Sequence, residues 1–225
     1  MDLSSKQKQA WILREEGEAA KSLAINYGIY YQQETDKDWQ SAINTLVDIS
    51  LSWSVLAKQT GESLYFEAAL SSVLQAKKIA DFHRLPLRKD FNFHLGRALK
   101  NVGQYEQALQ ALNRFVDEEQ DNLTKAELAE AKSQLAFALV KTGKKNEGLK
   151  LLHQNVGTLI NCPAEISTQG KDLTAIRKAG AQIKLAQVIE NKTEAKEILR
   201  KVIQETKEKG LGARTAEAEK LLESI

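Results

Sequence analysis

Residue types that commonly carry catalysis are few in this sequence, and none lies at a spacing that catalysis requires. The three histidines, His83, His94 and His153, stand far apart, and none has a second ligand at metal-binding spacing. The single cysteine, Cys162, excludes an intramolecular disulfide and a zinc finger. The sequence contains no phosphate-loop, dinucleotide-binding, nucleophile-elbow or zinc-protease motif. We therefore expect a protein that is not an enzyme and that uses no cofactor and no metal.

The side chains best suited to recognition are cations and amides within predicted helices. Arg97 has the planar fork that binds a carboxylate through two hydrogen bonds, and Lys141 can add a point charge. Asn101 can hydrogen-bond a peptide main chain. Such groups recognise a partner only if the chain brings them to one surface, so the helices that carry them decide what they can do.

Two amphipathic helices joined by a glycine turn are predicted over residues 93–119. Apolar residues recur at helical spacing on both sides of Gly103, with polar residues between them. Gly103 lies where the first apolar stripe ends, and glycine readily adopts the left-handed conformation that ends many helices. The chain therefore turns back at Gly103, and the two helices pack antiparallel.

The same stretch resembles a tetratricopeptide repeat. Gly96 and Ala108 carry almost no side chain, which lets the two helices approach closely. The closing proline of the family is absent, and Gln120 stands near its place. The positions that carry the resemblance are Leu95, Gly96, Leu99, Gly103, Tyr105 and Ala108.

A second copy of this hairpin follows at a constant offset of 40 residues. Repeats at a fixed period are typical of a solenoid, in which each hairpin buries a face against its neighbours. The copy departs from the family at Lys145, which replaces the aromatic residue, and at Gly148, which lowers helix propensity by about 1 kcal/mol relative to alanine. Its matching positions are Leu135, Ala136, Leu139, Gly143 and Gly148.

These patterns predict an all-α fold, and the resemblance implies a right-handed α-solenoid of stacked antiparallel helical hairpins. We expect one continuous domain. Residues 157–171, which include Cys162 and Pro163, form the least regular stretch. The expected elements are one long N-terminal helix within 1–36, hairpins at about 37–83, 87–119, 124–159 and 172–209, and a capping helix over 213–224.

The composition is compatible with such a fold and limits the kinds of partner. The 225 residues are 42% hydrophobic and 28% charged, with only two prolines and a net charge of +2. So small a net charge gives no general attraction to nucleic acid or membrane. No uncharged apolar run reaches 18 residues and no signal-type segment begins the chain, so we expect a cytoplasmic protein. An excess of Lys and Arg in residues 122–225 indicates a weak preference for acidic partners or, alternatively, an ordinary lysine-rich surface.

The resemblance also implies a binding surface, because the first helix of each hairpin lines the concave side of tetratricopeptide arrays. That side commonly holds a peptide of a partner protein. We expect a groove for an acidic peptide or a C-terminal carboxylate, although the aromatics can instead form inter-repeat core. Only Asn101 and Arg97 match the Lys–Asn–Asn–Lys–Arg clamp of some members, so that clamp is not inferred. The residues expected to line the groove are Trp53, Phe93, Arg97, Lys100, Asn101, Phe137, Lys141, Arg177 and Lys184.

The functional hypothesis that follows is a protein-interaction module or adaptor that binds a partner peptide on its concave face. The alternative is a structural repeat protein that self-associates into a homo-oligomer through its open ends or its long first helix. A lesser alternative is a peptide-sensing regulator subunit.

Overall fold

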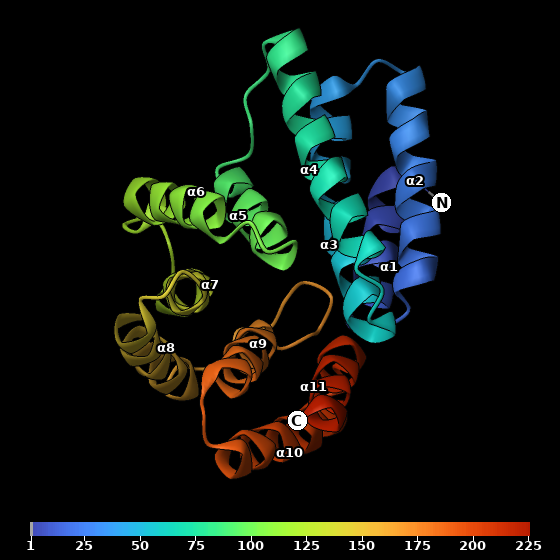
Figure 1. Ribbon diagram of the computed structural model, residues 1–225. Helices are drawn as coiled ribbons and strands as arrows, with labels where there is room; N and C mark the ends of the chain where they lie inside the picture. The colour runs from blue at the N-terminus through green and yellow to red at the C-terminus, as the bar shows by residue number, and fades with distance from the viewer. Residues whose placement is uncertain (1) are drawn as a thin grey trace.

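The computed structural model describes residues 2–225, which form eleven α-helices and no β-strand (Figure 1). No helix among these residues is long and apolar enough to cross a membrane. The helices are α1 (Leu3–Glu15), α2 (Ala19–Thr35), α3 (Trp39–Thr60), α4 (Leu64–His83), α5 (Phe91–Asn101), α6 (Tyr105–Glu119), α7 (Lys125–Lys141), α8 (Lys145–Ile160), α9 (Leu173–Val188), α10 (Lys192–Glu208) and α11 (Gly212–Ser224).

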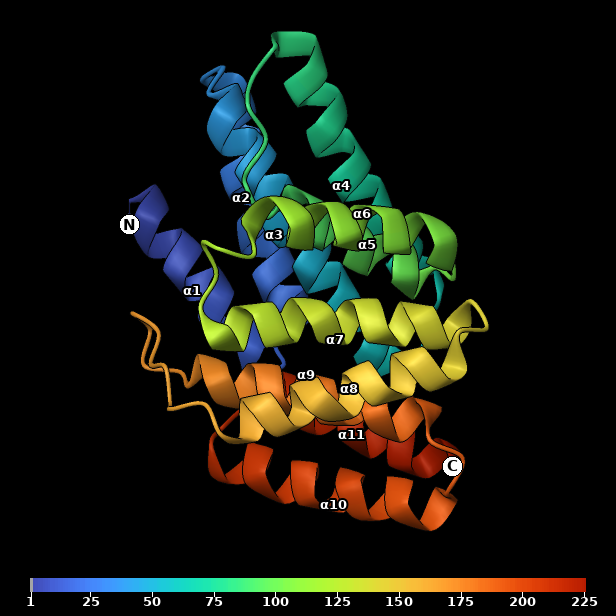
Figure 2. The same cartoon turned by 90° about the vertical axis from the view of Figure 1, so that its left-hand side faces the viewer.

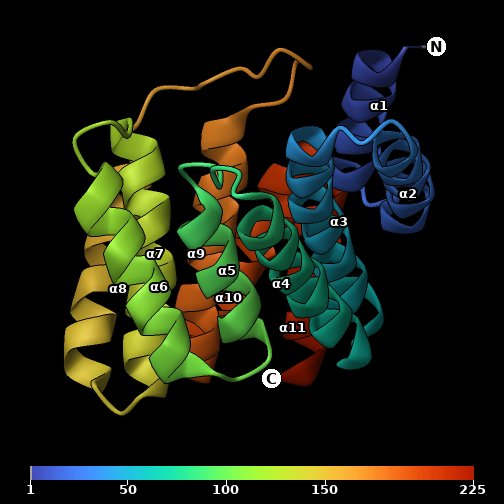
Figure 3. The same cartoon turned by 90° about the horizontal axis from the view of Figure 1, so that it is seen from above.

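Consecutive helices pair into antiparallel hairpins from α1–α2 to α9–α10, and α11 covers the last of them. The hairpins stand side by side, as the view from above shows (Figure 3), and α5 to α10 lie in stacked layers when seen from the side (Figure 2). Each hairpin buries its apolar stripe against the next, which is how a solenoid forms its core. The predicted all-α helical-repeat fold is confirmed.

The N-terminal region differs from the prediction, because α1 and α2 replace the single long helix expected there. The break is at Gly17, which has a φ of +90°. Residues with side chains rarely adopt this conformation, so glycine permits a turn that a continuous helix does not contain. The Gly17 and Glu18 amides then donate to the carbonyls of Arg14 and Leu13. The prediction of one long helix was wrong, and these residues form a further hairpin.

Close contact between the paired helices depends on small residues. A Cβ atom on Gly96 would lie 2.6 Å from Leu112 Cγ, so α5 and α6 pack with no room for a side chain there. In the next hairpin, at the position that corresponds to Ala108, a Cβ on Gly148 would lie 2.6 Å from both the Ala136 carbonyl oxygen and Val140 Cγ2. Gly148 therefore allows α7 and α8 to meet, and this close approach accounts for a residue of low helix propensity at that position.

The two ends of the array meet, which makes the solenoid a closed ring of helices (Figure 1). α11 packs against α3 and α1, and Lys220 of α11 donates to the Gln59 carbonyl of α3 at 3.5 Å. At the same junction, a Cβ on Gly212 would lie 2.2 Å from the Glu16 carbonyl oxygen. Only glycine allows the two backbones to approach so closely. The expectation of open ends was wrong.

The irregular stretch between the last two hairpins begins later than predicted, because α8 continues to Ile160. Ile166 pairs with Asp172 in an isolated β-bridge. The Thr174 hydroxyl donates to the Pro163 carbonyl at 2.9 Å. Residues 161–172 are thereby held against the start of α9, and Lys171 reaches Glu16 at 3.2 Å across the junction.

Candidate functional site: the inner cavity

The inner cavity consists of two chambers joined by a narrow neck, all lined by residues of α3, α5, α7 and α9. Residues of α11 complete the first chamber, and residues of α1 complete the second. One chamber has a volume of about 380 Å³ and the other about 350 Å³, while the neck has about 100 Å³. Arg97 lines all three spaces, which places it at the centre of the ring. The first helices of the hairpins therefore do share one hollow surface.

The first chamber, called here the cationic chamber, has one carboxylate, Glu217, among its lining residues. Its walls also include the aromatic rings of Phe66, Tyr105 and Phe137. The chamber therefore combines apolar surface with a strong excess of positive charge. Its six cationic residues are Lys58, Arg97, Lys100, Lys184, Arg214 and Lys220.

Glu217 neutralises two of these cations. Its carboxylate lies 2.8 Å from Lys58 Nζ and 2.7 Å from an Arg214 guanidinium nitrogen. Although burial raises the pKa of a carboxyl group, Lys58 and Arg214 hold the pKa of Glu217 well below its usual range. Because Lys58 belongs to α3 and Glu217 to α11, this cluster also joins the two ends of the ring.

Three other cations, Arg97, Lys100 and Lys184, have no carboxylate oxygen within 4.0 Å among residues 2–225. Lys100 Nζ lies 5.0 Å from the centre of the Phe137 ring, and Arg97 lies over Phe93 at 5.4 Å. Lys184 donates to the Gly180 carbonyl at 2.8 Å, which uses one of its three N–H groups. The chamber thus contains cationic donors without anionic partners.

The pKa values of these groups are lowered by their surroundings. Burial is the largest cause for Lys184, and the nearby Lys58 and Arg214 add to it, so that the pKa of Lys184 is lowered to about 7. Burial and the charge of Lys184 likewise hold the pKa of Lys100 well below its usual value. The chamber therefore holds lysines whose charged forms are disfavoured by burial and by the neighbouring cations.

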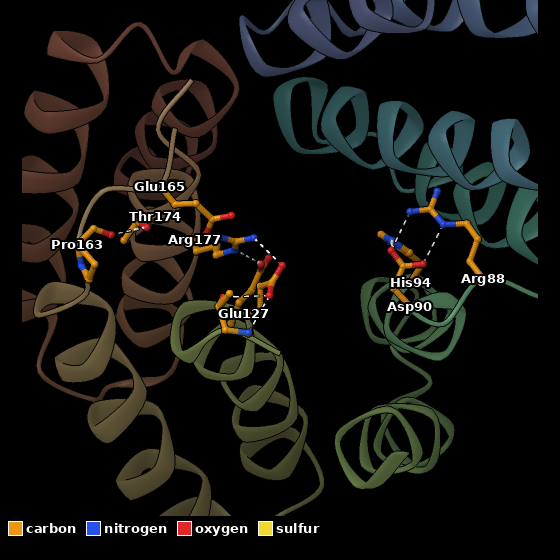
Figure 4. Close-up of polar contacts among 10 residues, drawn as sticks. Arg88, Asp90, His94, Glu127, Pro163, Glu165, Thr174 and Arg177 are labelled. Atoms are coloured by element: carbon orange, nitrogen blue, oxygen red, sulfur yellow. Dashed lines mark hydrogen bonds and ion pairs between the residues drawn. The ribbon is translucent and has the colours of Figure 1, made fainter. Parts of the chain in front are cut away.

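The second chamber, called here the ion-pair chamber, differs because its charges are matched (Figure 4). On one side, Arg88 binds Asp90 at 2.7 Å, and His94 Nε2 lies 3.1 Å from the same carboxylate. Burial opposes ionisation of Asp90, but the contacts with His94 and Arg88 hold its pKa well below the usual range. Burial lowers the pKa of His94 despite the nearby Asp90.

On the facing side of the ion-pair chamber, Arg177 is surrounded by three carboxylates (Figure 4). Its guanidinium lies 3.3 Å from Glu127 and from Glu130 on α7, and 2.5 Å from Glu165 in the irregular 161–172 segment. Arg177 is therefore a structural cross-link between α7, α9 and that segment, with little capacity left for a ligand.

The structure separates the residues that sequence reasoning grouped as one groove. Phe93 and Arg177 line the ion-pair chamber. Trp53 stacks on Tyr65 and donates to the Tyr27 hydroxyl at 3.1 Å, which places it between α2 and α4 and outside both chambers. Lys141 is exposed and also lies outside, over the Phe137 ring. Five predicted residues meet in the cationic chamber, namely Arg97, Lys100, Asn101, Phe137 and Lys184.

Sequence reasoning missed the contribution of the two ends of the array. Lys58 stands near the end of α3, and Arg214, Glu217 and Lys220 belong to α11, which was predicted only to cover the last apolar face. No local pattern marks these residues, because they reach the chamber only when the ring closes. Metal chemistry has no candidate centre here, since no group of three His, Cys, Asp or Glu side chains among residues 2–225 has the geometry to hold an ion.

No protein-family model matches the sequence, and no curated protein is similar to it in sequence. Solved structures do share its architecture. The nearly identical TPR-like repeats designated as a kinesin light chain of Podosopora anserina align over 92% of this chain and 96% of theirs, with a TM-score of 0.56 and 17% identity. A form of those repeats with one substituted residue gives a TM-score of 0.57, at 17% identity over 92% of this chain and 95% of theirs. The fold is a TPR-like helical repeat array. At this identity, the likeness extends to the fold and not to a partner.

Proposed function

We propose that this TPR-like array is a non-enzymatic protein-interaction module that binds a short acidic peptide of a partner in its cationic chamber. The observation that carries the proposal is the chamber itself, where six cationic side chains line the wall with one carboxylate. Arg97 and Lys100 supply charged donors without carboxylate partners, and Asn101 adds an amide that can bind a peptide main chain.

The size of the chamber favours a short segment over a long helix. Its volume of about 380 Å³ lies in the lower part of the range of ligand pockets, about 300–1,000 Å³. A segment that fits this volume presents only a few residues to the cations. Acidic side chains are then favoured by charge, while Tyr105 and Phe137 provide apolar surface for the residues beside them.

A phage-displayed random peptide library tests the proposal, with the wild-type protein, Arg97→Glu and Lys141→Glu as immobilised baits. We expect Asp- and Glu-rich peptides to be enriched by the wild type and by Lys141→Glu, because Lys141 lies outside the chamber. Arg97→Glu reverses a charge inside it and should weaken those peptides by about 30-fold or more in a fluorescence-polarisation titration.

The same titration supplies the contradicting outcomes. Enrichment without acidic residues, or equal affinity for the wild type and Arg97→Glu, would refute binding in the chamber. Circular dichroism of each variant is the folding control. A variant with the helical signal of the wild type has lost binding without losing its fold.

Self-association is a second candidate function, and one surface feature favours it. The outer end of the α2–α4 region carries exposed Tyr31, Leu74 and Phe82, of which Phe82 is 81% exposed. α4 extends beyond the rest of the ring at this end (Figure 2). Light scattering of the wild type and of Phe82→Ser tests it. A dimer that becomes a monomer in the variant would support self-association through this end, and a monomeric wild type would exclude it.

A further inference from the structure

The cationic chamber contains a feature that an acidic peptide alone does not explain. Arg97 and Lys100 from α5 and Lys184 from α9 converge on it without carboxylate partners, and Lys184 is only 7% exposed. Gln134, from α7, lines the same space, is 2% exposed and carries an NH₂ group that can donate hydrogen bonds. Arg97 and Lys100 are half-buried while Lys184 and Gln134 are buried, so one chamber brings together three cations that no carboxylate neutralises and a buried amide.

Other cations on the inner surface do have carboxylate partners. Arg177 has three carboxylates around it, Arg88 is paired with Asp90, and Lys58 and Arg214 share Glu217. The inner surface therefore supplies carboxylates to its other buried cations. The same helices leave a region of concentrated positive charge beside Phe137 and Tyr105.

We propose that Arg97, Lys100, Lys184 and Gln134 form a subsite for a dianionic phosphoryl group, carried on a phosphate monoester. This goes beyond the proposed peptide binding, because the subsite can be occupied by a small phosphate ester alone. The phosphoryl group is favoured over a single carboxylate because it brings about two negative charges and three acceptor oxygens to several converging donors.

The donors suit these acceptors individually. The guanidinium of Arg97 can bind two phosphoryl oxygens at once, and the two lysines act as point charges. The amide of Gln134 can turn its NH₂ group toward a third oxygen. The aromatic walls, Tyr105 and Phe137, can contact the organic group of the ester.

Proton uptake is a second consequence of this arrangement. Five charged groups face Lys184: Lys58 from α3, Arg97 and Lys100 from α5, and Arg214 and Glu217 from α11. Together with burial, the cations lower the pKa of Lys184 to about 7, and a bound dianion opposes their effect. At pH 8 the empty chamber therefore holds Lys184 mostly neutral, and the ligand should draw a proton onto it.

Isothermal titration calorimetry with phenyl phosphate at pH 8 tests the subsite. The ester is almost fully dianionic at this pH, since its second pKa is about 6. Repeating the titration in two buffers of different ionisation enthalpy measures proton uptake. We expect phenyl phosphate to bind 1:1 and the complex to take up protons. In Lys184→Gln the affinity should be lower by about tenfold or more, and the proton uptake should be smaller. The exposed Lys201→Gln serves as the matched control and should behave as the wild type.

A peptide carrying phosphotyrosine and its unphosphorylated glutamate analogue complete the experiment. Tighter binding of the phosphopeptide than of phenyl phosphate identifies a modified protein as the source of the ester, and equal binding identifies a small molecule. Both results support the subsite. Binding of the glutamate peptide without binding of phenyl phosphate overturns the subsite but leaves the peptide proposal standing. If neither phenyl phosphate nor either peptide binds, both the phosphoryl subsite and the acidic-peptide proposal are overturned. The phosphoryl subsite is also overturned if Lys184→Gln and Arg97→Gln bind phenyl phosphate as tightly as the wild type.

Discussion

Replacing Lys184 with methionine should make the empty protein more stable, because the buried ammonium opposes folding at neutral pH. Each unit between folded and unfolded pKa values corresponds to about 1.4 kcal/mol. The fall in the pKa of Lys184 from 10.5 to about 7 therefore sets an upper limit of about 5 kcal/mol. The variant loses one hydrogen bond to Gly180, worth about 1 kcal/mol, and methionine keeps most of the side-chain volume. We expect a net gain of about 3 kcal/mol, allowing for partial relaxation around the charge.

The sign of the pH dependence follows from which state binds the proton. Between about pH 7 and pH 10.5 the unfolded chain keeps Lys184 protonated while the folded protein does not. The stability of the wild type therefore rises with pH across this window, and the methionine variant lacks this contribution. The difference between the two proteins should be largest below pH 7 and should disappear near pH 10.5.

Urea unfolding followed by circular dichroism at pH 6.5 and pH 9.5 measures this difference. With an m-value of about 3 kcal/mol/M, the midpoint of Lys184→Met should exceed that of the wild type by about 1 M at pH 6.5. At pH 9.5 the gain should be less than half as large. The exposed Lys201→Met should show no such pH dependence. A midpoint of Lys184→Met below the wild type at pH 6.5, or an equal gain at both pH values, would refute the reasoning.

Three further predictions concern the closure of the ring and the packing of its hairpins. Glu217→Gln should lower stability by about 2–4 kcal/mol in thermal or urea unfolding, because Lys58 and Arg214 lose their shared carboxylate. The exposed pair of Lys207 and Glu219 provides the control, since Glu219→Gln should change stability by less than about 1 kcal/mol. The pKa of Glu217 is lowered on folding, so its contribution to stability is present above about pH 4.5 and is lost as the pH falls further. The unfolding midpoint of the wild type should therefore fall more steeply with decreasing pH than that of Glu217→Gln. Gly148→Ala should destabilise by about 1–3 kcal/mol because its Cβ meets the Ala136 carbonyl, whereas Gly157→Ala, with nothing within 4 Å, should stabilise by up to about 1 kcal/mol. A stabilised Gly148→Ala would contradict the close approach of α7 and α8.

Local sequence patterns were sufficient to predict the helical hairpins. Apolar spacing and turn glycines such as Gly103 and Gly143 report on backbone preferences within a few residues, and those preferences survive in the folded protein. The same local reasoning failed at Gly17, where one long helix was expected to continue. A glycine between charged residues with no apolar neighbour was the signal for the turn.

The sequence by itself therefore determined the hairpins from α3 to α10 and their order, and the family resemblance indicated which helix of each faces inward. Only the tertiary structure decided that Lys58 and α11 would meet Arg97 and Lys184 around one chamber, while Trp53 and Lys141 would point elsewhere. The physical reason is that each hairpin is rotated slightly against the next, and these rotations add up along the array. Their sum depends on side-chain contacts between hairpins, such as the close approach of Gly212 to Glu16, which no local spacing encodes.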